Sequence, residues 1–247
     1  MTDTEKIFTR IYSRNHWHSA ESRSGPGSTA VRTKRLRLQL NALLRELNIR
    51  TLLDIPCGDF NWMRLADLRS IQYTGADIVP ELVRKNTLRY RSPRRRFIRA
   101  DITRGPLPKS DLVLCRDGLI HLSFSDIERA MQTIRESGST YLLLTTFTDC
   151  SRNTDIATGD FRPLNFRRAP FHFPAALRTL ADGPMLDGSY PDQVLALYRV
   201  RDLPARFEYA ARAAAFQRAA NRLREGMETI LWEARRTYAR WRYGLSE

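Results

Sequence analysis

The sequence has few cysteines and no long apolar segment. Its three cysteines, Cys57, Cys115 and Cys150, lie far apart and form no Cys-x-x-Cys pair. This spacing argues against a disulfide framework and against a structural zinc site. No apolar run is long enough to span a bilayer, and the polar, charged N-terminus is unlike a secretion signal. We therefore expect reduced thiols, no metal and a cytoplasmic location.

Acidic residues are also scarce, since 27 Asp and Glu face 41 Lys and Arg, which gives a formal net charge of +14. Between Arg84 and Arg104 there are nine basic residues and one acid, Asp101; the basic positions are 84, 85, 89, 91, 94, 95, 96, 99 and 104. Such a patch favours a polyanion or an anionic membrane surface, although a solvated helix and loop is the simpler explanation. No nucleic-acid-binding module or aromatic interleaving accompanies the patch, so nucleic acid is the less favoured partner.

Hydrophobic patterning indicates an α/β fold. Apolar runs predict strands at 51–55, 71–76, 96–100, 111–115, 140–147 and 194–200, and helical patterns at 59–68, 80–90 and 125–137 lie between most of them. This alternation predicts a Rossmann-like, doubly wound, mostly parallel sheet with helices on both faces. An earlier helix, capped by Ser28, carries a leucine stripe from Leu36 to Leu47 that should pack on the sheet.

The length of 247 residues fits one domain with a short appendage. We expect residues 1–203 to form this domain, including an N-terminal helical cap. Residues 204–247 read as a basic helical tail that packs on the domain or a partner, or less favourably on an anionic membrane surface.

The most informative motif is the turn after the first strand, which runs from Asp54 to Phe60 as Asp-Ile-Pro-Cys-Gly-Asp-Phe. A buried strand brings the chain to the carboxyl edge of the sheet, and Gly58 allows the backbone to approach a ligand closely. Asp77, after the second strand, is placed to accept both hydroxyls of a ribose. The turn lacks the three spaced glycines that a pyrophosphate requires, which favours a nucleoside ligand without phosphates.

This turn resembles motif I of the class I S-adenosylmethionine (SAM) dependent methyltransferases, and the resemblance extends from about Ile11 to Val200. The chain departs from the family pattern at Pro56 and Phe60, where glycine is common, and the bulky Phe60 is a candidate wall of the pocket. The resemblance implies the class I fold, SAM as cofactor, and adenine contacts from Asp101 and Ile102. The full set of cofactor residues that it implies is Asp54, Pro56, Cys57, Gly58, Phe60, Asp77, Ile78, Asp101, Ile102 and Arg116.

Several short segments are similar to a narrower bacterial subgroup. They are Ser24-Gly25-Pro26-Gly27-Ser28, the turn from Asp54 to Trp62, Cys115-Arg116-Asp117, Thr145-Thr146-Phe147 and the segment from Gly159 to Asn165. Members of this subgroup are tied to glycan tailoring, and the chain resembles nodulation-type O-methyltransferases that modify a fucosyl residue of lipochitooligosaccharides. The resemblance therefore implies methyl transfer to a hydroxyl of a carbohydrate or glycolipid.

A sugar hydroxyl is a poor nucleophile until its proton leaves, so a nearby base is useful. His121 is the first candidate for this catalytic base and Asp117 the second. The two are four residues apart, and a helical turn would place both on one face at the rim of the sheet. The structural alternatives are a buried histidine bonded to backbone and an aspartate that caps a helix or contacts the cofactor.

The segment 148–174 shows neither a strand nor a helix period and predicts a lid or substrate wall. Its candidate acceptor contacts are Asn153, Asp155, Arg162 and Asn165, with Phe161, Phe171 and Phe173 available to stack on a sugar ring. An equal alternative for Arg162 is that it ties the loop down through Asp155 or Asp160. Two other functions stay open: an RNA methyltransferase that uses the 84–104 patch, and a non-catalytic SAM-binding scaffold.

Overall fold

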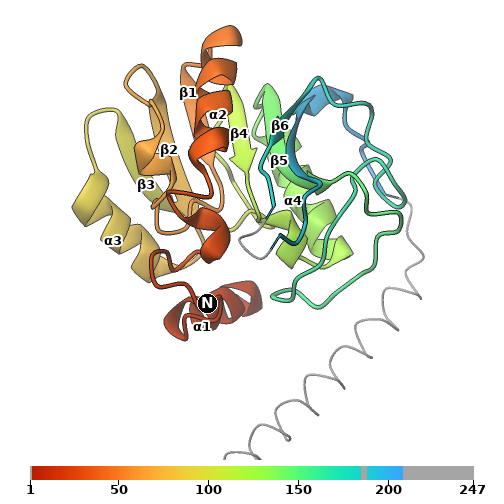
Figure 1. Cartoon of the computed structure of the whole chain (residues 1–247), viewed down its shortest axis with the longest axis horizontal. Coiled ribbons are helices and arrows are strands. Elements are labelled where there is room, and N and C mark those ends of the chain that lie inside the picture. The colour runs from red at the N-terminus through yellow and green to blue at the C-terminus, as the bar shows by residue number, and fades with distance from the viewer. Residues whose placement is uncertain (1, 185–187, 208–247) are drawn as a thin grey trace, which may run out of the picture.

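A mixed sheet of seven strands, in the order β3-β2-β1-β4-β5-β7-β6, forms the centre of the molecule (Figure 1). The computed structural model describes residues 2–184 and 188–207. The strands are β1 (Thr51–Asp54), β2 (Gln72–Asp77), β3 (Arg95–Arg99), β4 (Leu112–Cys115), β5 (Tyr141–Phe147), β6 (Arg178–Ala181) and β7 (Gln193–Arg199). Strands β1 to β5 are parallel, whereas β7 runs antiparallel to β5 and β6. This arrangement confirms the predicted fold class; most of the predicted 204–247 tail lies outside the described residues.

The described part of the chain has four α-helices around the sheet: α1 (Asp3–Ser13), α2 (Lys34–Glu46), α3 (Pro80–Tyr90) and α4 (Phe124–Glu136). The leucine stripe of α2 is buried as expected, because Leu36, Leu40, Leu43 and Leu44 recur with the helical period and face the sheet. Helix α3 begins with a proline in its first turn, and Ser123 caps α4 by accepting the backbone N–H of Asp126.

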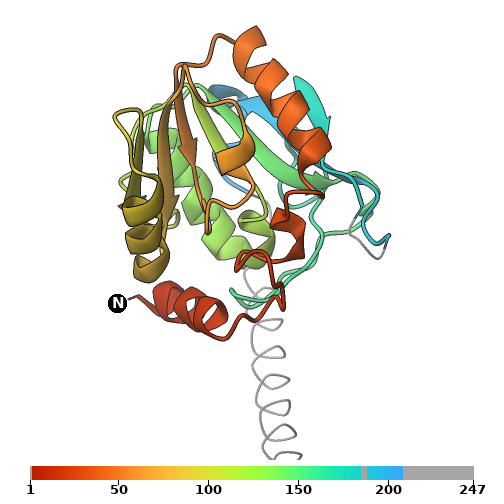
Figure 2. The same cartoon turned by 60° about the vertical axis from the view of Figure 1, so that its left-hand side comes forward.

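The helices cover both faces of the sheet because side chains alternate along each strand. In β1, Leu52 packs in the cluster that contains the α2 leucines, whereas its neighbour Leu53 packs in the cluster that contains Ile127 and Met131 of α4. Figure 2 shows α2 and α4 on opposite sides of the sheet. The core is therefore two apolar layers separated by the strands.

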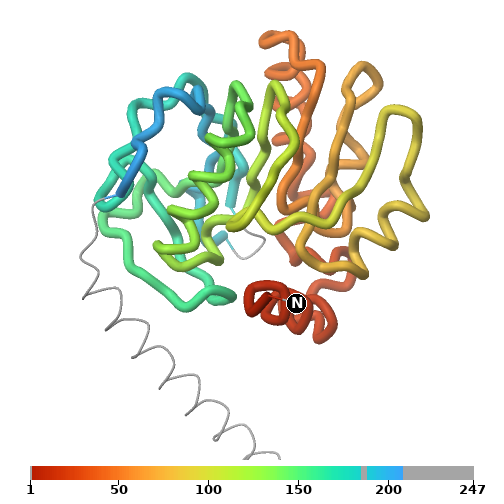
Figure 3. The backbone as a smooth tube through the Cα atoms, turned by 180° about the vertical axis from the view of Figure 1, so that it is seen from behind, coloured from red at the N-terminus to blue at the C-terminus, as the bar shows by residue number. Residues whose placement is uncertain are grey.

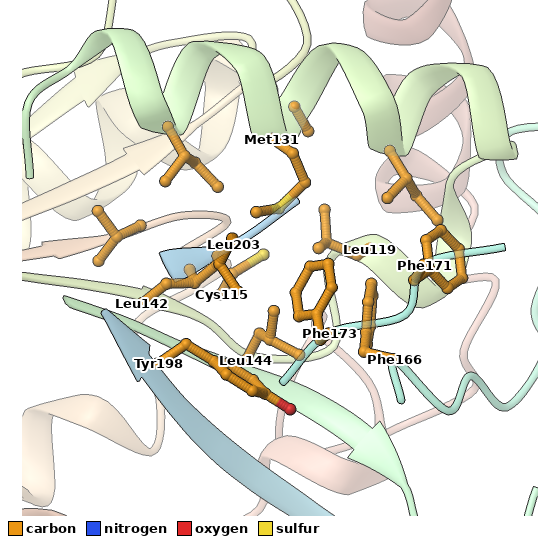
Figure 4. Packing of buried hydrophobic residues seen from close by; sticks show 14 of the residues in the cluster. Cys115, Leu119, Met131, Leu142, Leu144, Phe166, Phe171, Phe173, Tyr198 and Leu203 are labelled. Atoms are coloured by element: carbon orange, nitrogen blue, oxygen red, sulfur yellow. The ribbon is translucent and has the colours of Figure 1, made fainter. Parts of the chain in front are cut away.

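The long segment after β5 contributes core rather than an acceptor-stacking wall. Phe166, Phe171 and Phe173 are buried, and their rings form a contiguous cluster with centroids 4.8 and 5.0 Å apart (Figure 4). Tyr198 of β7 meets Phe173 edge-on at 5.3 Å. The expectation that Phe171 and Phe173 stack on a ligand was wrong, because both rings fill the layer between α4 and the sheet.

Three local expectations also need correction. The segment 59–68 holds only a short 3-10 turn (Met63–Leu65), because Phe60 adopts a left-handed conformation with φ of 60° and places its ring in the core. Ser28 does not cap α2, which begins at Lys34; it ends a separate 3-10 turn (Pro26–Ser28). The edge strand β6 went unpredicted because its exposed Arg178 and Thr179 interrupt any apolar pattern.

The carboxyl ends of the parallel strands lie at one edge of the sheet, and α1 runs across that edge (Figures 1 and 3). An ion pair of 2.6 Å between Glu5 and Arg99 ties α1 to β3. Among the described residues, no helix has the length and apolarity that a membrane crossing requires. The position of α1 closes one side of the space where ligands of such sheets bind.

Candidate active site

A cavity of about 1080 Å³, its open mouth included, lies at the carboxyl edge of the sheet beneath α1. Four acids line it: Asp54 and Asp77 end β1 and β2, and Asp101 and Asp117 follow β3 and β4. The structure therefore brings together the four acids that the sequence places at one rim.

The turn after β1 is held from two sides. The backbone N–H of Gly58 donates to Asp77 Oδ2 at 3.0 Å, and the backbone N–H of Asp59 donates to Ser24 Oγ at 3.0 Å. A side chain at Gly58 is excluded because φ is 55° and a Cβ atom would lie 2.0 Å from Ser24 Oγ. The Ser24–Ser28 motif thus packs directly on the turn that it accompanies in the sequence.

Burial dominates the electrostatics of two of the acids. It raises the pKa of Asp54 to about 7, although a 2.6 Å hydrogen bond from the Tyr73 hydroxyl opposes the shift. Burial also raises the pKa of Asp77 to about 6, against the opposing backbone N–H donors of Val79 and Gly58. Both carboxylates are therefore poised to ionise when a cation or a hydroxyl donor enters the cavity.

Arg116 is a buried cation at the cavity wall. Its guanidinium donates to Asp182 at 2.9 and 3.1 Å and to the Gly27 carbonyl at 2.8 Å, and it pairs with Asp117 at 3.2 Å. Burial opposes its charge, but Asp117 and Asp182 outweigh burial and raise the pKa of Arg116. The side chain is therefore a fixed positive charge that connects the N-terminal segment to the sheet.

His121 lines the cavity with one nitrogen already committed. Its Nδ1 lies 2.8 Å from the carbonyl oxygen of Asp160, so Nδ1 carries the proton of the neutral ring and the lone pair lies on Nε2. Burial lowers the pKa of His121 below its ordinary value, although the Asp160 carbonyl and Asp117 act in the opposite direction. The ring is therefore neutral near pH 7 and able to accept a proton.

Asp117 is rigidly held. Its carboxylate Oδ1 accepts hydrogen bonds from Thr145 Oγ1 at 3.1 Å and from Gln193 Nε2 at 2.9 Å. The predicted helical turn from Asp117 to His121 is absent, because Asp117 has φ of 55° and only Leu119–His121 form a 3-10 turn. Both side chains nonetheless reach the cavity.

The other residues predicted to bind the cofactor lie in two places, the cavity wall and the core. Those that line the cavity are Pro56, Cys57, Gly58, Ile78 and Ile102, together with the acids and Arg116 already described. Phe60 does not: its side chain is fully buried, 5.1 Å from the Tyr73 ring and 5.2 Å from the Phe97 ring, under the guanidinium of Arg95. The expectation that Phe60 walls the pocket is corrected, because its left-handed backbone turns the ring into the core.

The four predicted acceptor contacts are buried and serve the loop itself. Arg162 donates to the carbonyls of Leu119 and Ile120 at 3.2 and 2.6 Å. Asn153 donates to the carbonyls of Asn165 and Ala169, Asn165 donates to those of Thr148 and Cys150, and Asp155 accepts from the N–H of Phe124. None of the four lines the cavity, so they hold the segment 148–174 in place instead of facing an acceptor.

Sequence reasoning missed the contribution of α1 and the segment after it. Thr4, Phe8, Ile11, Tyr12 and Trp17 line the cavity. The apolar residues at 8, 11 and 12 have the i, i+3, i+4 spacing of an amphipathic helix, and this spacing could have predicted the helix. What no pattern revealed is that this helix lies against a ligand cavity as well as against α3.

Comparisons with known proteins agree with this geometry. Residues 52–137 match the methyltransferase domain family. The methyltransferase domain of bacterial CtHen1 aligns with a TM-score of 0.50 at 14% identity, covering 68% of this chain and 98% of that one, which shows a shared fold.

Two further structures are similar over smaller parts. SAM-bound CalS10, an amino pentose methyltransferase from Micromonospora echinaspora, has a TM-score of 0.39 and 18% identity, covering 44% of this chain and 48% of its own. A SAM-dependent methyltransferase from Mesorhizobium loti has a TM-score of 0.35 and 19% identity, covering 43% and 52%. A search of curated proteins found no match.

Proposed function

Since the chain contains a class I SAM-dependent methyltransferase domain, we propose that it transfers a methyl group to a hydroxyl of a carbohydrate or glycolipid. A fucosyl residue of a nodulation factor is the narrower form of this proposal. The observation that carries it is a neutral histidine, fixed by backbone, in the same cavity as the acids that follow β1 to β3.

The residues of the cavity fit SAM. Asp77 would accept from the ribose hydroxyls, Asp101 from the adenine amino group, and Ile78 and Ile102 would contact the adenine ring. Arg116 supplies a positive charge for the methionine carboxylate, while Asp54 offsets the positive sulfonium and ammonium groups. When bound, SAM supplies an electrophilic methyl group, and the protein has mainly to orient the acceptor and remove its proton.

His121 would hold that proton. With Nδ1 donating to the Asp160 carbonyl, Nε2 would accept the proton of the acceptor hydroxyl. Asp117 lies on the same cavity and stabilises the imidazolium that forms, since it already favours the charged ring. Asp117 is engaged by Thr145, Gln193 and Arg116, which makes it the weaker candidate for the base itself.

Aromatic rings around His121 support a sugar as the acceptor. The Trp17 ring lies 4.7 Å from the His121 ring, and the Phe161 ring lies 5.8 Å away on the segment 148–174. Phe161 does not line the cavity itself, but it is 40% exposed and packs against Tyr190 at 5.3 Å, so part of an aromatic side chain is accessible beside His121. Sugar rings present apolar C–H faces that bind such surfaces, whereas their hydroxyls reach nearby polar groups.

The basic 84–104 patch gives less support to RNA as the acceptor. Arg94, Arg95 and Arg96 lie at the start of β3, at the opposite end of the sheet from the cavity, while Arg99 and Lys85 are paired with Glu5 and Glu81. A non-catalytic scaffold would have no need of a histidine oriented on a cavity.

The proposal is tested by incubating the full chain with methyl-labelled SAM and a panel of fucosylated and unfucosylated oligosaccharides, lipid-linked and free. The expected result is label transferred to a saccharide hydroxyl, at a much lower rate in His121→Gln. Tight SAM binding with no transfer to any saccharide would overturn it, and transfer to RNA alone would replace it.

A further inference from the structure

A second concave surface lies at the amino-terminal edge of the sheet, at the far end of the strands from the active-site cavity. It is a groove of about 630 Å³, its open side included, formed by the starts of β1 and β2, the turn before β3 and the segment 108–110. No residue lines both this groove and the cavity, and Gln72 of the groove and Asp77 of the cavity lie at opposite ends of β2. The groove is therefore distinct from the methyl-transfer site.

The groove is lined by four cations, Arg94, Arg95, Arg96 and Lys109, and by no carboxylate. Across residues 2–184 and 188–207, none of these four forms an ion pair. By contrast, Lys85 and Arg99 of the same basic segment are paired with Glu81 and Glu5. Positive charge left unpaired in a concave surface raises the local concentration of anions.

Two of the arginines are held in place by the protein. Arg96 Nε donates to Thr74 Oγ1 at 3.0 Å, and Arg95 donates to the Tyr90 carbonyl at 3.3 Å with its guanidinium 4.9 Å from the centre of the Phe60 ring. The Nε of Arg95 is buried and has no hydrogen-bond partner among the described residues. Two backbone hydrogen bonds of 3.0 Å between Ser92 and Arg95 fix the turn that presents them.

We propose that this groove binds a phosphate group of a soluble ligand. Guanidinium groups form paired hydrogen bonds with phosphate oxygens, and their prior fixation lowers the entropy lost on binding. A concave groove suits a compact phosphate better than it suits a bilayer surface. A second ligand-binding function is thus assigned to the edge opposite the active site.

The test is isothermal titration of the full chain with inorganic pyrophosphate at low salt. Arg94→Gln combined with Arg96→Gln should raise the Kd at least tenfold. Arg84→Gln combined with Arg89→Gln removes the same charge from exposed positions of α3 that do not line the groove, and this control should change the Kd less than twofold. Unchanged SAM affinity and Tm in both double variants establish that the fold is intact.

Parallel titrations identify the source of the phosphate. A short oligouridylate that competes with pyrophosphate, and loses affinity only in the groove variant, supports the site with a nucleic acid as its ligand. If both double variants lose affinity for pyrophosphate equally, binding depends only on the overall positive charge, and the proposal is overturned. Binding to phosphatidylglycerol vesicles without binding of pyrophosphate would also overturn it, in favour of a lipid surface.

Discussion

At the scale of single residues, the proposed chemistry rests on His121, whose protonation is set by its surroundings. The Asp160 carbonyl fixes the Nδ1 proton and burial keeps the ring neutral. His121→Gln should lower kcat by about 10²- to 10⁴-fold, the usual contribution of general-base catalysis, with SAM affinity nearly unchanged. His18→Gln, at an exposed histidine, is the matched control. Equal kcat in the two variants would contradict the assignment.

The same residue predicts the pH profile. The proposed mechanism requires the neutral ring, so kcat, measured at saturating SAM, should fall as pH drops through the pKa of His121. Because burial lowers that pKa from 6.5, the acid limb should lie below pH 6.5. The limb should vanish from the residual activity of His121→Gln; a limb that persists there belongs to another group.

The buried acids predict pH-linked SAM binding. In the proposed complex, Asp54, with a pKa of about 7, would ionise to offset the positive sulfonium and ammonium groups, and Asp77, with a pKa of about 6, would ionise to accept hydrogen bonds from the ribose hydroxyls. SAM should therefore bind more tightly as pH rises from 5 to 8 and release protons, measured by calorimetry in buffers of different ionisation enthalpy.

The same shifts act on stability with the opposite sign. The unfolded carboxyls release their protons near 3.8, whereas the folded ones retain them to about 6 and 7, so these groups lower the free energy of unfolding as pH rises through that window. Asp54→Asn should remove the change near pH 7 from both the SAM affinity and the free energy of unfolding. A SAM affinity that is flat between pH 5 and 8 would show that neither acid faces the ligand.

At the scale of elements, Arg162 joins the segment 148–174 to the 3-10 turn that carries His121. Its guanidinium donates to the carbonyls of Leu119, Ile120 and Leu122, and burial lowers its pKa to about 9, which still leaves it charged at neutral pH. The alternative that Arg162 ties the loop down fits the structure: its guanidinium donates to backbone carbonyls, and the charge of Asp155 favours its ionised form.

Arg162→Met should lower the free energy of unfolding by about 3 kcal/mol, because buried carbonyls lose their donors. It should also lower kcat, since the 3-10 turn loses its support. Urea unfolding and initial rates measure the two effects, and Arg152→Met, at an exposed arginine of the same segment, should change neither. A stable Arg162→Met variant with reduced acceptor affinity would instead restore the role that the sequence suggested.

Elements with strong local patterns were predictable. The strands other than β6 and the helices α3 and α4 matched, because apolar runs and the 3.6-residue helical period are local properties of the sequence. The helix predicted at 59–68 is absent because Phe60 takes a left-handed conformation that tertiary packing supports. The predicted acceptor contacts do not line the cavity for a related reason. Polar side chains that can bind a sugar can equally bind the backbone groups of a loop without secondary structure, as they do at Asn153, Asp155, Arg162 and Asn165.

At the scale of the whole molecule, the N-terminal region covers the cavity. Helix α1 lines it and is tied down by the Glu5–Arg99 ion pair and by a 3.0 Å hydrogen bond from Lys85 to the Tyr12 hydroxyl. The Ser24–Ser28 motif adds the contact between Gly27 and Arg116. A ligand in the cavity therefore stabilises the closed position of α1.

SAM should slow tryptic cleavage after Arg10 and Arg14, which are exposed on and next to α1. Cleavage after Arg91 and Arg94, at the opposite edge of the sheet, should continue at the same rate and serves as the internal control. Equal protection at both places would indicate global stabilisation, and no protection at Arg10 and Arg14 would mean that α1 does not close over the ligand.

The sequence alone determined the parallel strands, the two faces of the sheet and the acids at its rim, because apolar runs and the residues at the end of each parallel strand are local properties. Tertiary structure alone decided which of those side chains share a cavity, that α1 covers it, that Phe60 lies in the core, and which histidine nitrogen is free. These depend on contacts between residues far apart in the chain, such as Ser24 with Asp59 and His121 with Asp160, and no local pattern encodes such contacts.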